Sequence, residues 1–215
     1  MLRQIAILVV TPAPVSHAPW LDQMFDQERH VLTQTGLLTL AMDMPCRRGS
    51  PTLQRVWAET LDDVREAGLV DNTIARLDGL ARIGPLTIVT NGAAWRDWPA
   101  LKLAALRSGS DLGVLASLQP EPGYLMGEKR AELIDLALWI GSDSGFSATT
   151  ETVSPPSLAE EDDLIVAKTV RLYRAFLRFL AVTGRMSAAV YENADAGIDH
   201  EVRRLRNKTK KRRSR

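Results

Sequence analysis

Short apolar runs alternate with amphipathic segments along the first two thirds of the chain. Five apolar runs stop at or near Gly, Pro, Asn or Asp and are typical of strands buried on both faces, at 5–10, 37–42, 86–90, 112–118 and 136–140. The segments between them have helical spacing, at 20–35, 52–67, 72–81, 99–107 and 124–134. Strands that alternate with helices predict an α/β fold, a three-layer Rossmann-like parallel sheet with helices on both faces.

From residue 157 onward the pattern is entirely helical. Ser157 and Glu160 have the spacing of a capping box, and apolar residues at steps of three and four predict a long helix that ends before Gly184. A second helix is expected at about 186–206. We therefore predict a Rossmann-like domain, a C-terminal helical extension and a basic disordered tail, at 1–154, 155–206 and 207–215.

The formal net charge of +1 conceals a separation of charge along the chain. Nine of the 27 Lys and Arg lie within 203–215, which has no acidic residue, so 18 basic residues oppose 26 acidic ones in the rest. The body is therefore negative and the tail strongly positive. Nine like charges in thirteen residues repel one another, which predicts disorder until an anion neutralises them.

Nucleic-acid phosphate is the partner that such a tail favours. The residues expected to contact it are Arg203, Arg204, Arg206, Lys208, Lys210, Lys211, Arg212 and Arg213. The alternatives are the protein's own acidic body, an acidic protein, or a contribution to solubility alone. The tail has no aromatic residue, so it is not expected to stack on bases.

A second candidate site lies beyond the carboxyl ends of the predicted strands, where open parallel sheets bind ligands. The loop 141–151, GSDSGFSATTE, can bring backbone N–H groups and hydroxyls to an anion such as phosphate, although a simple connection between two elements is the alternative. The ligand-binding candidates are Thr11, Asn91, Gly92, Ser142, Asp143, Ser144, Gly145 and Glu151. Neither a Walker motif nor GxGxxG is present.

Other polar features are better explained by structure than by chemistry. Cys46 precedes two arginines, which would lower its thiol pKa, yet an unreactive loop cysteine is the favoured interpretation. Four basic residues on one side of the long helix predict a solvated face, at Lys168, Arg171, Arg174 and Arg178. No spacing indicates a metal site or a Ser-His-Asp triad. The single cysteine and the lack of a long apolar run predict a cytoplasmic protein without a membrane segment.

Two strand-to-turn segments carry a resemblance to a known superfamily. LTIVTNGAAWRDW runs from a strand into a turn and helix, and LALWIGSDSGFSATTE runs from a strand into a Gly-containing turn followed by Thr and Glu. Together they make residues 85–151 resemble SLOG-type Rossmann-like proteins, the superfamily of DNA-processing protein A and the phosphoribohydrolases. The resemblance implies nucleotide binding.

The function predicted from these features is noncatalytic binding, with nucleic acid at the tail and a nucleotide-type ligand at the strand ends. One alternative is a small nucleotide-processing hydrolase with Glu151 as an acid–base group. Another is a structural subunit of a larger complex, or a homo-oligomer, whose long apolar helix packs on a partner. Whether the protein is an enzyme stays open, and no cofactor is predicted.

Overall fold

The computed structural model describes residues 2–14, 30–43, 46, 51–61, 65–91, 98–118, 120–121, 131–136 and 158–213. Its strands are β1 (Leu2–Pro14), β2 (His30–Asp43), β3 (Thr52–Thr60), β4 (Leu86–Thr90), β5 (Pro120–Glu121) and β6 (Ala131–Asp135). Its helices are α2 (Glu66–Ile83), α3 (Trp98–Ser108), the 3₁₀ turn η2 (Gly113–Ser117), α5 (Leu158–Val182) and α6 (Ala188–Arg213).

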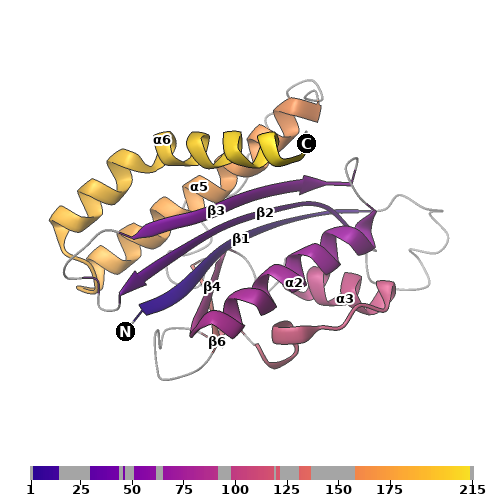
Figure 1. Cartoon of the computed structure of the whole chain (residues 1–215). Helices are drawn as coiled ribbons and strands as arrows, with labels where there is room; N and C mark the ends of the chain where they lie inside the picture. Colours follow the sequence, from indigo (N-terminus) through magenta and orange to yellow (C-terminus); the bar gives the residue numbers. More distant parts are fainter. Residues whose placement is uncertain are drawn as a thin grey trace.

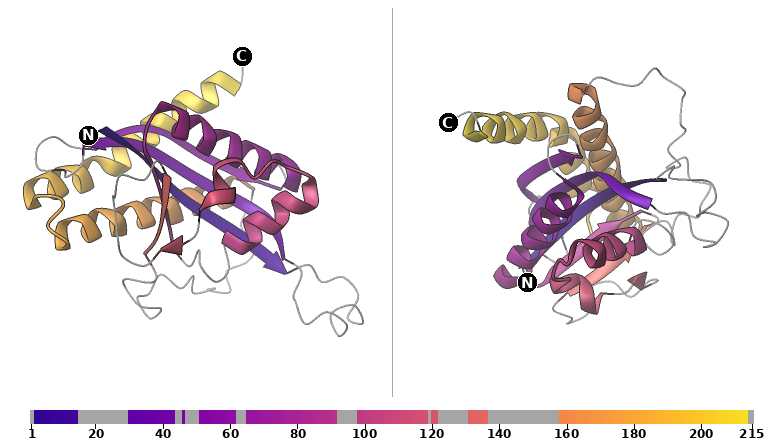
Figure 2. Two further views of the ribbon diagram at one scale, coloured as in Figure 1. Left: turned by 90° about the horizontal axis from the view of Figure 1, so that it is seen from below. Right: turned by 90° about the vertical axis from the view of Figure 1, so that its right-hand side faces the viewer.

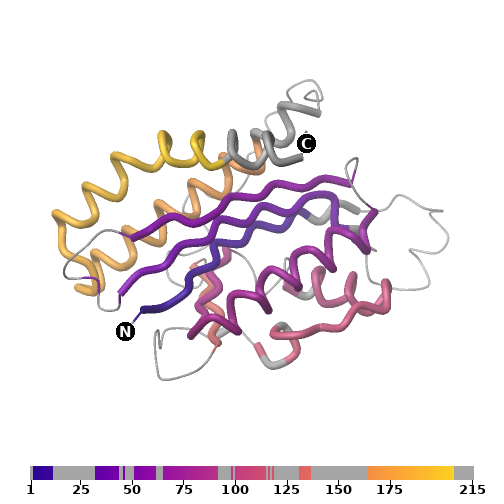
Figure 3. The backbone as a smooth tube through the Cα atoms, viewed as in Figure 1, coloured from indigo at the N-terminus to yellow at the C-terminus, as the bar shows by residue number. Residues whose placement is uncertain are grey.

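The strands form one mixed sheet in the order β3-β2-β1-β4-β6-β5. The long strand β2 pairs antiparallel with both β1 and β3. β4 pairs parallel to β1, and β6 pairs parallel to β4 and to the two-residue β5. β1 lies between the antiparallel strands β2 and β3 and the parallel strands β4, β6 and β5, as the backbone trace shows (Figure 3). The protein is thus a mixed α/β fold with a partly parallel sheet, and the entirely parallel sheet that we predicted is wrong.

Two segments predicted as helices contain strands where the structure describes them. The helix expected at 20–35 overlaps the start of β2 at His30, and the helix expected at 52–67 contains β3. In β3 the side chain of Val56 is buried while its neighbour Arg55 is exposed, and the strand pairs with β2 over eight positions. Pairing of this kind with a distant segment overrides local helical spacing.

Some of the other predicted elements are confirmed and others differ from the structure. The strand at 86–90 is β4, the runs at 5–10 and 37–42 lie within β1 and β2, and the helices at 72–81 and 99–107 lie within α2 and α3. Residues 113–117 form a 3₁₀ turn rather than a strand, and the expected helix at 124–134 ends in β6. Of the strand expected at 136–140, only Leu136 lies in the described part, directly after β6.

Helices pack against both faces of the sheet (Figures 1 and 2). Along β1 the side chains alternate, so that Ile5 and Ile7 join a core cluster with α5 and α6, and Ala6 and Leu8 join a cluster with α2 and α3. A continuous apolar strand results because both faces are covered. The C-terminal helices therefore contribute to the main core. The division at residue 154 into a Rossmann-like domain and a helical extension stays a prediction.

Candidate functional site

The strand ends that we predicted as a ligand site do not lie side by side, because β1 extends beyond β4 and β6. β1, β4 and β6 run in one direction, so their carboxyl ends point the same way. Val89 pairs with Ile7, and Thr11 therefore lies roughly 10 Å beyond the end of β4. The structure brings Thr90 and the half-buried Asn91 close to the end of β6 but does not bring Thr11 to the same level.

The other predicted ligand residues lie outside the described residues. They are Gly92, Ser142, Asp143, Ser144, Gly145 and Glu151. The loop that we considered an anion site therefore stays a prediction.

Asp135, which the sequence reasoning missed, ends β6 in register with Thr90. The Asp135 side chain is completely buried and that of Thr90 nearly so. The Leu136 N–H donates to the Thr90 carbonyl at 2.9 Å, which ties the ends of β4 and β6 together. A carboxylate within the apolar sequence LIDL was the available signal, because such a residue is buried only where it has partners.

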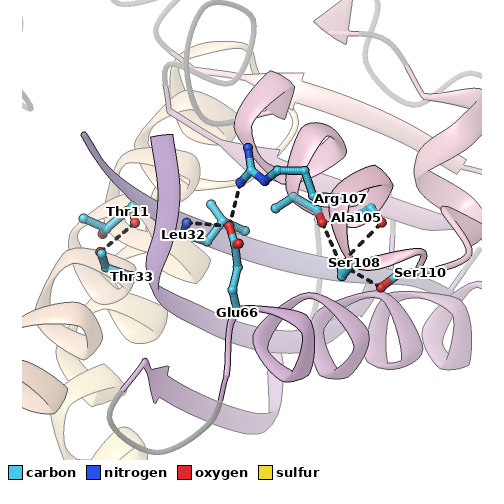
Figure 4. A network of polar contacts seen from close by, with 9 residues as sticks. Thr11, Leu32, Thr33, Glu66, Ala105, Arg107, Ser108 and Ser110 are labelled. Atoms are coloured by element: carbon cyan, nitrogen blue, oxygen red, sulfur yellow. Dashed lines mark hydrogen bonds and ion pairs between the residues drawn. The ribbon is translucent and has the colours of Figure 1, made fainter. Parts of the chain in front are cut away.

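Thr11 belongs to the part of the edge where β1 and β2 pair. The Thr33 hydroxyl donates to the Thr11 carbonyl at 2.8 Å (Figure 4). Nearby along β2, Glu66 Oε1 accepts a hydrogen bond from the Leu32 N–H at 3.0 Å and from Arg107 at 2.7 Å. The carboxylate of Glu66 thereby joins β2, α2 and α3, which is a structural role.

No metal centre emerges from this part of the chain. Among the residues that the structure describes, no three or more His, Cys, Asp or Glu side chains gather in a group that could hold an ion. A search of the same residues finds no helix with the length and apolar character needed to cross a bilayer.

Cys46 is buried and held between the sheet and the C-terminal helices. Its N–H donates to the Arg185 carbonyl at 2.8 Å, and it forms an isolated parallel bridge with Met186. Burial, and then the negative charge of Asp43, raise the pKa of the thiol. The predicted lowering by the adjacent arginines is therefore wrong, and the raised pKa favours an unreactive thiol.

The basic row on α5 is partly engaged by α6 rather than wholly solvated. Arg174 donates to Asp195 at 2.9 Å and to Asp199 at 3.1 Å, and Arg178 donates to the Tyr191 hydroxyl at 3.2 Å. These contacts fasten the two helices together. They also neutralise part of the acidic N-terminal half of α6, which corrects the prediction of a fully solvated face.

The basic segment of α6 is helical. α6 continues without a break to Arg213, whereas we predicted disorder from residue 207. The helix is already nucleated where Ile198, Val202 and Leu205 are buried, Lys and Arg have high helix propensity, and the helix dipole favours cations at the C-terminus. Together these terms outweigh the like-charge repulsion on which the prediction rested.

The predicted nucleic-acid residues thus all lie on one helix. Arg203 and Arg204 are exposed, and Arg204 Nε donates to Glu201 at 2.9 Å. For the other six the structure describes the helical backbone only, and these are Arg206, Lys208, Lys210, Lys211, Arg212 and Arg213.

Comparison with known proteins does not assign this chain to a family. Neither a protein-family model nor a curated protein sequence matches this chain. The resemblance of residues 85–151 to SLOG-type proteins therefore stays a prediction.

Proposed function

We propose that this protein binds nucleic acid, without catalysis, through the basic C-terminal part of α6. The observation that carries the proposal is the continuity of α6, which runs from the buried Leu205 on to Arg213 without a break. A rigid helix holds its charges at fixed spacing, so fewer degrees of freedom are lost on binding than from a disordered tail.

The charge density of this helix matches that of a nucleic acid. Residues 203–213 contain eight Lys or Arg, and eleven helical residues span roughly 16 Å. This gives about one positive charge per 2 Å, which lies between the one phosphate per ~1.7 Å of duplex DNA and the one per ~3.4 Å of each strand. An acidic protein would seldom present a comparable density, which favours nucleic acid among the possible anions.

Three carboxylates of α6 itself compete weakly for these charges. Asp195 and Asp199, the acidic residues of α6 nearest to α5, are already bound by Arg174. Glu201 pairs with Arg204 within the helix, and such exposed pairs contribute little energy. A polyanion that releases many counterions can displace them.

A second binding activity, for a nucleotide-type ligand, is supported by the half-buried Asn91, which follows β4 beside the end of β6. Under this proposal the half of the fold built from β1, β4 and β6 acts as a Rossmann-like, three-layer unit, and the protein is cytoplasmic. The hydrolase and the structural subunit remain the alternatives. Melting shifts with nucleotides that Asn91→Ala abolishes would support the ligand, and turnover would favour the hydrolase.

Salt-dependent binding of a fluorescent DNA oligomer tests the main proposal. If six phosphates are contacted, affinity should fall about 10³-fold between 50 and 200 mM salt. Changing Lys208, Lys210, Lys211 and Arg212 together to Gln, which preserves helix propensity, should weaken binding. The slope of log K against log salt should also become shallower, by about 0.9 for each phosphate that the variant no longer neutralises.

The control variant removes exposed charge elsewhere. Arg82→Gln and Arg171→Gln change exposed arginines on α2 and α5 and should leave both the affinity and its salt dependence nearly unchanged. Equal affinity of the parent protein and the α6 variant would exclude α6 as the nucleic-acid site.

A further inference from the structure

Edge strand β3 carries an aromatic and arginine cluster on the face that points toward α2. β3 is the first strand of the sheet, so one of its edges has no partner in the described part of the chain. Trp57 is half-buried and lies between its neighbours Arg55, which is exposed, and Glu59, which is buried. These three residues alternate along the strand and share one face, because side chains two apart in a strand point the same way.

The cluster holds two guanidinium groups against one indole ring. The guanidinium carbon of Arg76, from α2, lies 5.0 Å from the Trp57 ring centroid, and that of Arg55 lies 5.8 Å from it. Both distances are within the range of cation–π attraction. The indole is thereby fixed at the edge of the sheet.

The two arginines differ in what else they bind. Arg76 is committed to Glu59, with 2.5 Å between Nη2 and Oε1, and Asn72 donates to the second carboxylate oxygen at 3.3 Å. Arg55 is exposed, and no carboxylate of the described residues pairs with it. Arg55 therefore presents a planar cation beside an aromatic ring, and no carboxylate of the described residues neutralises its charge.

The same strand lies beside the proposed nucleic-acid helix. Val56, on the opposite face of β3, belongs to the core cluster that contains Val202 and Leu205 of α6. Figures 1 and 2 show α6 running along β3. A polymer held by α6 that crosses this edge of the sheet meets Arg55 and Trp57.

We propose that Arg55 and Trp57 stack on unpaired bases of a single-stranded nucleic acid whose phosphates are held by α6. This inference rests on the proposed function and specifies its substrate class. Arginine planes and aromatic rings are the groups on which proteins stack exposed bases. In a duplex the base faces are already stacked on one another, so only a single strand offers them. The pair supplies the aromatic contact that the basic segment of α6 lacks.

A comparison of two oligomers of equal charge isolates the stacking. The parent protein is titrated with a fluorescent oligothymidylate and with an abasic phosphodiester oligomer of the same length, at one salt concentration. We expect the oligomer with bases to bind more tightly, by about 5- to 150-fold for each stacked base. Trp57→Ala should remove most of this preference, and Arg55→Ala should reduce it.

Controls separate stacking from charge and from stability. Arg82→Ala removes one exposed arginine from α2, as Arg55→Ala does from β3, and should leave the base preference unchanged. Because Trp57 packs against the core, the unfolding midpoint of Trp57→Ala is measured, and the exposed Arg55 supplies a second test that does not depend on packing.

The outcomes distinguish this inference from the proposed function. If the parent protein binds both oligomers equally, or if neither variant changes the base preference, the inference is overturned while the α6 site stands. If the parent protein binds a duplex of the same length but neither single strand, the inference is overturned and the α6 site stands. If it binds none of the three, the proposed function itself fails. Neutralising the basic residues of α6 should weaken the binding of both oligomers to the same extent and leave the ratio of their affinities unchanged.

Discussion

Replacing Gly36 with alanine tests how β2 is joined to α5. Gly36 lies in the middle of β2, and a Cβ atom added there would be 2.3 Å from Thr169 Oγ1 and 3.0 Å from Ile165 Cγ1. Contacts below 3.0 Å do not occur, so Thr169 or the helix must move. The glycine is therefore required by the close approach of helix to strand.

The size of the stability loss follows from the contacts that the added methyl group would disrupt. Thr169 is completely buried, and its hydroxyl donates to the Ile165 carbonyl at 2.8 Å. Rotating Thr169 breaks this bond, which costs about 1 kcal/mol, and overpacking of a core adds about 1–3 kcal/mol. We expect Gly36→Ala to lower the free energy of unfolding by about 2–4 kcal/mol.

Denaturant unfolding followed by circular dichroism measures the effect. Gly79→Ala, within α2 and with no atom near the added Cβ, is the matched control and should raise stability by up to about 1 kcal/mol. Adding Thr169→Ala to Gly36→Ala removes the clashing hydroxyl and should recover part of the loss. The reasoning is refuted if Gly36→Ala is as stable as the parent, or if the double variant shows no coupling.

Three further predictions follow from buried groups. Burial raises the pKa of Tyr173, so the folded state keeps its proton while the unfolded chain ionises; stability is lost as pH rises above about 10. Between pH 10 and 11 the unfolding free energy of Tyr173→Phe should fall by about 1 kcal/mol less than that of the parent. An unchanged pH slope in unfolding titrations would argue against a raised pKa for Tyr173. The Cys46 thiol, buried and of raised pKa, should react with an aromatic disulfide ~100-fold or more slowly when folded than in denaturant; equal rates would contradict its burial. Glu66→Ala should cost about 1–2 kcal/mol more than Arg107→Ala, because only the former leaves the Leu32 N–H without its acceptor; equal losses in denaturant titrations would rule that out.

Features that depend on local composition could be predicted before the fold was known. The apolar runs located the cores of β1, β2 and β4, and helical spacing located α3, α5 and most of α6. The separation of charge that supports the proposed function is also a property of the sequence alone. These features need no knowledge of partners, because the hydrophobic period within each segment is enough to specify them.

The pairing of strands and the contacts between distant side chains could be read from the folded chain alone. β3 has a spacing compatible with a helix, and its pairing with β2 is what places Arg55 and Trp57 on one face beside Arg76 of α2. Packing on the sheet likewise turned the basic tail into a continuation of α6. Both outcomes depend on contacts between residues far apart in the chain, whose energies exceed local propensities of a few tenths of a kcal/mol and leave no periodic signal in the sequence.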